Sequence, residues 1–349
     1  HELGHGLLAL GFGSGATASI LSNTRLEWVL ADLAVLSCAG VSNGIYPTDA
    51  ASQVQFLCED SGTTILFVED DEQLDKALEA RAQLPHLRHI VVFDMKGLHG
   101  LQDLMVMSLD DLRALGREHA SRHPQALKER VAACRPEDLA ILVYTSGTTG
   151  KPKGAMHTHG ALTYTARGFN TLIARDENDE CMCFLPLCHI SERVGGEYFS
   201  MYTGAVLNFV ENPETVPENV REIAPTIFNA VPRVWEKYDD RTIESVVKNP
   251  ELKDGAAAMT AYSRMQFTEM TDLERENLRQ ALLRYCELRG LIKRRNRIGI
   301  FISSRNMKAL ANFKRIERIF TTTLCTTARM PVNRDFNVII NFIHAFLSL

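Results

Sequence analysis

Short apolar runs alternate with amphipathic stretches from residue 17 to about residue 235, and this alternation is the main pattern in the chain. Runs rich in β-branched and aromatic residues predict strands, and these are TASIL, TTILFV, HIVVF, LAILVY and MCFLPL. Apolar residues at helical spacing predict covering helices in EWVLADLAVLSCA, ASQVQFLCED and DEQLDKALEARAQL. The pattern therefore predicts an α/β fold in which mostly parallel sheets are covered by helices.

The alternation weakens in two parts of the chain. Residues 94–136 are more polar and predict one or two surface helices before the chain returns to the sheet at LAILVY. Beyond about residue 240 the strand–helix alternation stops, although a charged helix is predicted for residues 264–290. We therefore predict a partial domain over residues 3–240 and a helical continuation over residues 241–290. For residues 291–349 we expect an atypical tail, for which a genuine but poorly ordered segment and an artefact of the sequence are the alternatives.

The composition narrows the class of protein. The 349 residues are 45% hydrophobic, enough for a large core, and carry a formal net charge of -5. This balance argues against nucleic acid as the main partner, so any phosphate must be bound by local groups. Eight cysteines without a secretory segment favour a reducing, cytoplasmic compartment. No apolar run is long enough to span a bilayer, and the apolar end FNVIINFIHAFLSL leaves peripheral membrane contact open.

The chain begins with HELGH, which has the spacing of a zinc peptidase motif. His1 and His5 would lie on one face of a helix, with Glu2 available to activate a metal-bound water. Gly4 and Gly6 weaken a helix there, and no later segment offers a clear third ligand, so we disfavour this interpretation. A chain that begins without Met inside an apolar segment also indicates a piece of a longer product.

Two further motifs have a structural interpretation. Residues 11–16 resemble a dinucleotide fingerprint with Asp32 as its acid, but they precede TASIL instead of following a strand. We interpret them as a turn that ends a helix. Cys181, Cys183 and Cys188 lie close together in sequence, but their spacing does not match the usual zinc sites and predicts core or surface thiols.

Residues 139–162 carry the most informative stretch, LAILVYTSGTTGKPKGAMHTHGAL. An apolar strand leads into residues 145–154, where hydroxyls, glycines and lysines are concentrated. Glycines allow main-chain N–H groups to approach a polyphosphate, while hydroxyls and lysines add donors and positive charge. The Walker pattern does not fit, because Gly147 and Gly150 are too close together. A flexible linker is the alternative, and the preceding strand and two lysines favour phosphate binding.

The sequence YTSGTTGKPKG resembles the signature loop of the adenylate-forming, AMP-binding superfamily. Neighbouring segments are similar to long-chain fatty acid–CoA ligases, among them LPLCHISERVGGEYFSMYTGA and PTIFNAVPRVWEKY. The resemblance covers about residues 3–240. It implies that a fatty carboxylate attacks ATP to give an acyl-adenylate and diphosphate, after which the thiol of CoA displaces AMP. The implied ligands are therefore ATP, Mg²⁺, a long-chain fatty acid and CoA.

The resemblance also implies roles for individual residues. The phosphate groups would be held by Thr145, Ser146, Gly147, Thr148, Thr149, Gly150 and Lys153. His189 would act as the catalytic residue where the substrate carboxylate and the α-phosphate meet; a structural histidine is the alternative. A structural ion pair is expected for Glu192 and Arg193, and His157 and His159 are expected to cap or start the helix after the loop.

Later motifs of the family are missing from the sequence. These include the adenine pocket, the magnesium glutamate and the catalytic lysine of the C-terminal lid. We therefore expect an incomplete and inactive fragment, since remote binding energy positions the reacting groups. The alternatives are a non-catalytic remnant with residual phosphate binding and an adenylate-forming ligase for another carboxylic acid.

Overall fold

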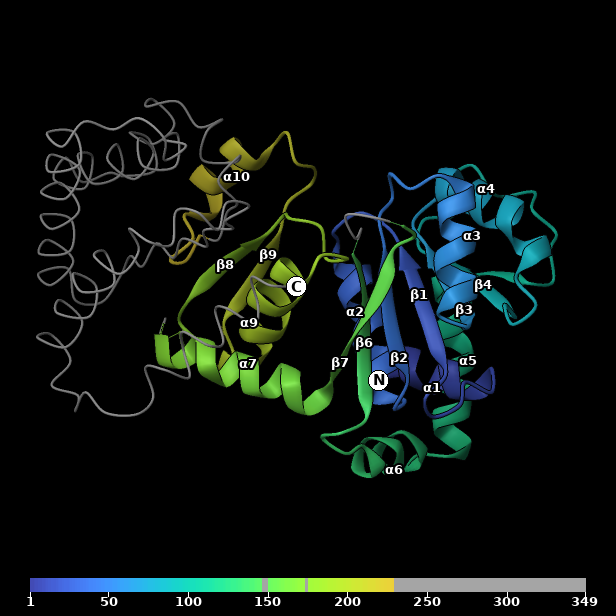
Figure 1. The fold of residues 1–349 in the computed structure, drawn as a ribbon, viewed down its shortest axis with the longest axis horizontal. Helices are drawn as coiled ribbons and strands as arrows, with labels where there is room; N and C mark the ends of the chain where they lie inside the picture. The colour runs from blue at the N-terminus through green and yellow to red at the C-terminus, as the bar shows by residue number, and fades with distance from the viewer. Residues whose placement is uncertain (146–149, 173–174, 229–349) are drawn as a thin grey trace, which may run out of the picture. The chain divides into compact units, whose positions relative to one another are not determined.

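The computed structural model describes residues 1–145, 150–172 and 175–228 (Figure 1). The chain divides into two compact units, of which the first contains residues 1–178 and 183–213. The second contains residues 179–182 and those from 214 onward. The predicted continuation and tail, residues 241–290 and 291–349, lie outside the described residues.

A seven-stranded sheet forms the centre of the first unit, with the order β5-β4-β3-β1-β2-β6-β7 (Figure 1). Its strands are β1 (Thr17–Leu21), β2 (Val41–Ile45), β3 (Thr63–Val68), β4 (His89–Val92), β5 (Val106–Ser108), β6 (Leu139–Thr145) and β7 (Lys153–Thr158). Neighbouring strands are parallel except for β6 and β7, which are antiparallel. The predicted α/β fold with a mostly parallel sheet is confirmed.

Helices connect the strands. They are α1 (Glu2–Ala9), α2 (Leu26–Ser37), α3 (Ala51–Asp60), α4 (Asp71–Ala80), the 3₁₀ turn η1 (Arg81–Gln83), α5 (Leu109–Arg122), α6 (Ala126–Ala133) and α7 (His159–Leu172). After these come α8 (Ile190–Glu192), the π-helical segment η2 (Arg193–Tyr198), α9 (Phe199–Thr203) and strand β9 (Val206–Phe209). Strand β8 (Glu180–Cys183) begins in the second unit, which also contains α10 (Val216–Ile223).

Two hydrophobic clusters cover opposite faces of the sheet. On one face Leu7 of α1, Trp28 of α2 and Leu112 of α5 are buried against Ile20 and Phe67. We call this side the α2 face. Successive side chains of a strand point to opposite faces, which explains why the next residues along the same strands belong to the other cluster.

The second cluster lies under α3 and α4, and we call this side the α3 face. Val54 of α3 and Leu74 of α4 pack there with Leu21, Ile45 and Leu66. Strands covered on both faces read as continuous apolar runs, which is why TASIL and TTILFV predict β1 and β3 from the sequence alone.

Strands β2, β5, β7 and β9 are not predicted by the apolar pattern. In β2 the residues Ser42 and Asn43 are fully buried, and Asn43 Nδ2 donates to Ser19 Oγ at 2.9 Å. Buried polar groups with hydrogen-bond partners therefore interrupt the apolar run of a central strand. The predicted strand MCFLPL was too long, because β8 ends at Cys183.

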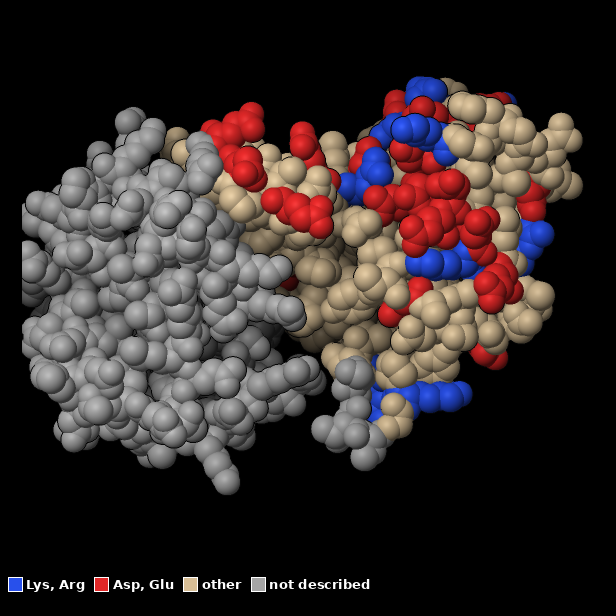
Figure 2. Space-filling model, turned by 90° about the horizontal axis from the view of Figure 1, so that it is seen from above, with Lys and Arg blue, Asp and Glu red and all other residues tan. Residues whose placement is uncertain are grey.

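Among the charged side chains of the described residues visible in Figure 2, acidic ones cover more of the surface than basic ones. This agrees with the formal net charge of -5. An anionic ligand is therefore not attracted to this face by a broad positive field and depends on local donors and cations. Within the part of the chain that the structure describes, no helix is long and apolar enough to cross a membrane.

Candidate functional site

The phosphate-binding segment predicted from the sequence connects the two strands of a hairpin. Thr145 ends β6 and pairs with Lys153, the first residue of β7. The predicted residues Ser146, Gly147, Thr148 and Thr149 lie outside the described residues. Gly150 has a φ of 118°, a conformation that side chains other than glycine rarely adopt. The expectation that the loop runs through residue 154 directly into a helix was wrong, because β7 intervenes and α7 begins at His159.

The register of the hairpin determines which face each side chain reaches. Tyr144 pairs with Gly154, and a Cβ added to Gly154 would lie 3.2 Å from the Tyr144 ring. Tyr144 packs with the cluster on the α3 face. Because side chains alternate along a strand, the adjacent pair Thr145 and Lys153 lies on the α2 face. His157 shares the Lys153 side of β7, and burial and the positive charge of Arg193 lower its pKa.

His189 lies near the carboxyl end of β2. A Cβ added to Gly44 of β2 would be 2.7 Å from Cys188 Cα and 3.3 Å from the Trp28 ring, so Cys188 approaches the α2 face of this strand. Ser42 of β2 pairs in parallel with Ile141 of β6, which places the carboxyl ends of the two strands together. The structure therefore brings His189 to the same edge and face of the sheet as the hairpin, where ligands of α/β sheets gather.

Thr24 holds the turn that precedes His189. Its Oγ1 donates to the carbonyl oxygen of Leu185 at 2.6 Å and accepts from the N–H of Leu187 at 3.2 Å. These two bonds satisfy backbone groups on both sides of Pro186. The loop after β1 therefore fixes the position from which the chain reaches His189.

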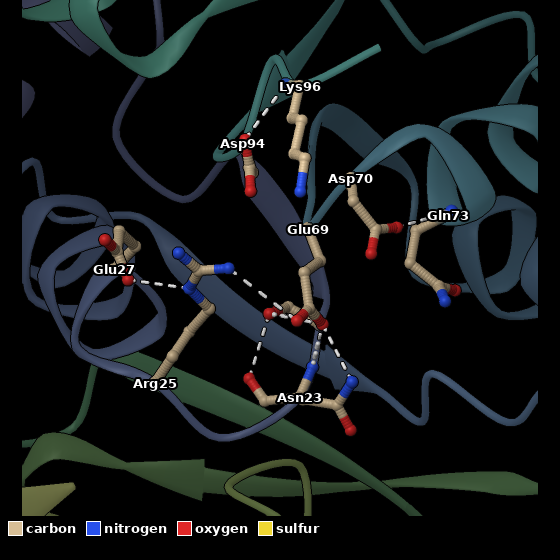
Figure 3. Close-up of polar contacts among 9 residues, drawn as sticks. Asn23, Arg25, Glu27, Glu69, Asp70, Gln73, Asp94 and Lys96 are labelled. Atoms are coloured by element: carbon tan, nitrogen blue, oxygen red, sulfur yellow. Dashed lines mark hydrogen bonds and ion pairs between the residues drawn. The ribbon is translucent and has the colours of Figure 1, made fainter. Parts of the chain in front are cut away.

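A polar cluster fixes the loop that contains Thr24 (Figure 3). Glu69, directly after β3, accepts from Asn23 N at 2.7 Å and from Asn23 Nδ2 at 3.0 Å. Arg25 lies 3.6 Å from Glu69 and 2.7 Å from Glu27, and the bond to Glu27 raises the pKa of Arg25. The residues on both sides of Thr24 are thus tied to neighbouring elements at the carboxyl edge of the sheet.

His189 is held in one tautomer. The N–H of Ser191 donates to His189 Nδ1 at 3.1 Å, so His189 caps α8 and its Nδ1 acts as an acceptor. The neutral ring then carries its proton on Nε2. Partial burial lowers the pKa of His189, although part of the ring remains exposed. His189 can therefore donate from Nε2 to an oxygen anion, and its Nδ1 is occupied.

A fully buried ion pair is formed by Arg193, whose backbone N–H donates to the carbonyl oxygen of His189. Arg193 in η2 pairs with Asp32 of α2 and donates to Ser42 Oγ at 2.7 Å. The hydroxyl of Tyr198 donates to the second oxygen of Asp32 at 2.6 Å. The expectation that Arg193 pairs with Glu192 was wrong, because Asp32, 161 residues away, reaches it through the core. This network joins the segment after His189 to α2 and β2.

Two buried acids flank the ion pair. Burial raises the pKa of Glu192 to about 8. Burial and then the charge of Asp32 raise the pKa of Glu197 well above its usual value. Glu192 therefore remains largely protonated at neutral pH, and the surroundings of Glu197 likewise favour its neutral form. The sequence analysis did not predict this network. The feature of the sequence that could have indicated it is the set of charged residues within the glycine-containing segment ERVGGEY.

The HELGH segment forms the helix α1 in spite of its glycines. A Cβ on Gly6 would lie 2.4 Å from the Leu112 carbonyl oxygen, and one on Gly116 would lie 1.9 Å from that of Glu2. The glycines thus permit close packing between α1 and α5. His5 is buried and its Nδ1 lies 2.9 Å from Nδ1 of His119. Among the described residues, no group of three or more His, Cys, Asp and Glu side chains is placed to hold a metal ion.

The remaining motifs have structural positions. Gly11, with a φ of 76°, lies in the turn after α1, as the helix-ending interpretation predicted. Asp32, considered as a nucleotide-binding acid, is instead the buried partner of Arg193. Cys181, Cys183 and Cys188 are buried in the core and form no disulfide, as predicted.

Comparison with known proteins identifies the family. The profile of the family described as AMP-binding enzyme matches residues 1–290. The chain belongs to the AMP-binding enzyme family. It is 31% identical over 262 residues to the long-chain-fatty-acid–CoA ligase ACSBG2 of Rattus norvegicus, covering 72% of this chain and 38% of that protein. It is 33% identical over 235 residues to FadD15 of Mycobacterium bovis, another long-chain-fatty-acid–CoA ligase, covering 66% and 37%.

Solved structures share the fold of this AMP-binding enzyme. The anthranilate CoA ligase AuaEII, crystallised with anthranoyl-AMP, aligns with a TM-score of 0.58 and 25% identity over 67% of this chain and 43% of that one. The N-terminal domain of FACL13 from Mycobacterium tuberculosis aligns with a TM-score of 0.55 and 18% identity, covering 74% and 64%. The chain spans between 34% and 38% of the length of the two ACSBG2 proteins and the FadD15 protein that it matches.

Proposed function

We propose that this AMP-binding enzyme is the N-terminal part of an AMP-forming ligase that joins a long-chain fatty acid to CoA. A carboxylate oxygen of the acid forms a bond to the α-phosphorus of ATP, and the bond from that phosphorus to the diphosphate oxygen breaks. The thiol sulfur of CoA then bonds to the carbonyl carbon of the acyl-adenylate. AMP leaves with the electrons of the acyl–oxygen bond, and the thiol proton is released to solvent.

One observation carries this proposal. The hairpin formed by β6 and β7 lies at the carboxyl end of β6, and Cys188, directly before His189, lies against the α2 face near the carboxyl end of the adjacent strand β2. Such an arrangement lets one ligand meet phosphate-binding groups and a second donor at the same time. Positioning two reactants in this way accounts for much of the catalysis of phosphoryl and nucleotidyl transfer.

Lys153, Thr145 and His189 have different proposed roles, which follow from the chemistry of their side chains. Lys153 supplies positive charge, and Thr145, with the segment that follows it, supplies donors to the β- and γ-phosphates. The Nε2–H of His189 donates to the carboxylate or to an α-phosphate oxygen, where negative charge is concentrated during attack. The lowered pKa of His189 favours a neutral donor in this role over a cation.

Magnesium is proposed to bind together with ATP. The described residues contain no group of three or more metal-ligating side chains, so they do not form a protein cage for the ion. Mg²⁺ does not require one, because it keeps several waters and commonly takes phosphate oxygens as ligands. When bound, the ion would neutralise charge on the phosphates.

The relatives ACSBG2 and FadD15 are long-chain-fatty-acid–CoA ligases, which supports a long-chain fatty acid as the substrate. The similarity to AuaEII, whose name specifies anthranilate, supports an aromatic acid as the second candidate. Exchange of labelled diphosphate into ATP in the presence of palmitate or anthranilate distinguishes them. Exchange that depends on anthranilate and not on palmitate would contradict the fatty-acid assignment.

Binding of ATP with magnesium to the 349-residue chain is the direct test, measured by calorimetry. Lys153→Met should weaken binding by about 10- to 100-fold, since a hydrogen bond to a charged group contributes about 1.5–3 kcal/mol. Lys153→Arg should retain much of the affinity, and Lys128→Met, a loss of the same charge on exposed α6, should change it little. Absence of ATP binding by the unsubstituted chain would favour a non-catalytic remnant.

A further inference from the structure

Two lysines separated only by Pro152 make different contacts. The Nζ of Lys151 lies 4.9 Å from the centre of the Phe56 ring on α3. Lys153 pairs with Thr145 on the α2 face, as derived above from the alternation of β7. A lysine over an aromatic face is attracted to the ring at this distance. The Lys151 side chain therefore lies on the α3 face, whereas the strand register points the Lys153 side chain to the α2 face.

A second contact ties the other strand of the hairpin to the same helix. The hydroxyl of Tyr144, in β6, donates to Asp60 Oδ2 at 2.7 Å. Burial, and then the hydrogen bond to Asp60, raise the pKa of Tyr144, which keeps the hydroxyl protonated as a donor. Gly154 of β7 packs against the same Tyr144 ring. Both strands of the hairpin are therefore connected to α3.

The two attachment points on α3 lie on one side of the helix. Phe56 and Asp60 are four residues apart, a spacing that places side chains one above the other. An adjoining side of α3 is held in the core by Val54 and Leu57, and Phe56 itself packs partly buried against the same cluster. Helix α3 is thus fixed in the core and contacts the hairpin through two side chains. Asp60 contacts Tyr144, before the segment that connects β6 to β7, and Phe56 contacts Lys151, after it.

We propose that α3 is the anchor that positions the phosphate-binding hairpin, with Lys151 and Tyr144 as positioning residues and Lys153 as the lysine that contacts phosphate. This inference rests on the function proposed above. The competing arrangement is one in which Lys151 leaves Phe56 and contacts phosphate itself. The two arrangements differ in whether the effect of Lys151 depends on the Phe56 ring.

A double-mutant cycle on ATP affinity separates them. Lys151→Met removes the charge and keeps an apolar stem, while Phe56→Leu removes the aromatic face and keeps apolar volume. If Lys151 acts through Phe56, each substitution should weaken ATP binding by about two- to fivefold, as expected for a cation–π contact at an exposed site. In the Phe56→Leu protein, Lys151→Met should then have no further effect. Lys151→Arg should preserve affinity in the presence of Phe56, and Lys128→Met is the charge control.

An equal loss of affinity from Lys151→Met in both backgrounds would overturn the anchor role of Lys151. As a contrast, Lys153→Met should weaken binding by the same factor with or without Phe56. Hydrogen exchange in the absence of ATP tests the anchor independently of the proposed function. Tyr144→Phe and Lys151→Met should each accelerate exchange of the β7 amides several-fold, and unchanged exchange in both variants would refute the anchor. Failure of the unsubstituted chain to bind ATP would contradict only the proposed function.

Discussion

Replacement of Arg193 by Met should destabilise the protein strongly. The side chains of Arg193 and Asp32 are both fully buried, and Arg193 also donates to Ser42 Oγ at 2.7 Å. Arg193→Met leaves the Asp32 carboxylate in the core without its cation, although the neutral hydroxyl of Tyr198 still donates to it. Breaking a buried pair on one side costs about 3–5 kcal/mol, because an uncompensated charge remains in a poorly solvated site. This is a large part of the ordinary stability of a domain, about 5–15 kcal/mol.

The expected loss in the free energy of unfolding is larger for this buried network than for a surface ion pair. Arg122 and Glu118 form an i,i+4 pair in which both side chains are more than half exposed. Arg122→Met should therefore change the free energy of unfolding by less than about 1 kcal/mol. The double variant Asp32→Leu with Arg193→Met removes both buried charges, and it should recover part of the loss, because only neutral hydroxyls then lack partners.

Urea unfolding followed by circular dichroism measures these free energies. The expected order of stability places Arg122→Met close to the unsubstituted chain, the double variant next and Arg193→Met last. If the free energy of unfolding of Arg193→Met lies within about 1 kcal/mol of that of the unsubstituted chain, the unpaired Asp32 carboxylate does not carry the penalty of about 3–5 kcal/mol. A double variant no more stable than Arg193→Met would show that packing, and not the unpaired carboxylate, dominates.

Two further predictions concern residues next to the site. Gly44→Ala should cost about 1–3 kcal/mol in urea unfolding, because the new Cβ would lie 2.7 Å from Cys188 Cα; Gly168→Ala in α7, where a Cβ meets nothing within 4 Å, should not destabilise. Because burial raises the pKa of Glu192 to about 8 from 4.5, the folded state retains a proton that the unfolded chain releases. Stability should fall as pH rises from about 5 to 8, by up to about 1.4 kcal/mol per unit, and Glu192→Gln should flatten that decline; an unchanged profile would contradict it.

The sheet was predictable where both faces of a strand bury apolar side chains. TASIL and TTILFV correspond to β1 and β3, and the predicted helix ASQVQFLCED corresponds to α3. Strand β2 was not predictable in this way, because it buries the polar residues Ser42 and Asn43 and contains Gly44, which packs closely against the backbone of Cys188. The partners of these residues come from distant segments, so local periodicity cannot report them.

Some residues of the candidate site were likewise predictable from the sequence, and others were not. Lys153 and His189 could be found because hydroxyls, glycines and lysines are concentrated after a strand and because both segments resemble a known family. Asp32 could not be assigned from sequence, since its partner Arg193 is 161 residues away and the charge pattern around Arg193 suggests the adjacent Glu192 instead. Burial decides this pairing, and burial is a property of the folded chain.

The missed strand β7 determines how the two lysines of the hairpin are interpreted. In a helix, side chains two residues apart point in widely different directions, whereas in a strand they share a face. Neither rule applies to Lys151 and Lys153, because β7 begins at Lys153 and Lys151 precedes the strand. Lys151 reaches the Phe56 ring on the α3 face, while Lys153 joins the register of β6 on the α2 face. Their similarity in sequence therefore does not imply a shared role, and this difference is why we propose positioning for Lys151 and phosphate contact for Lys153.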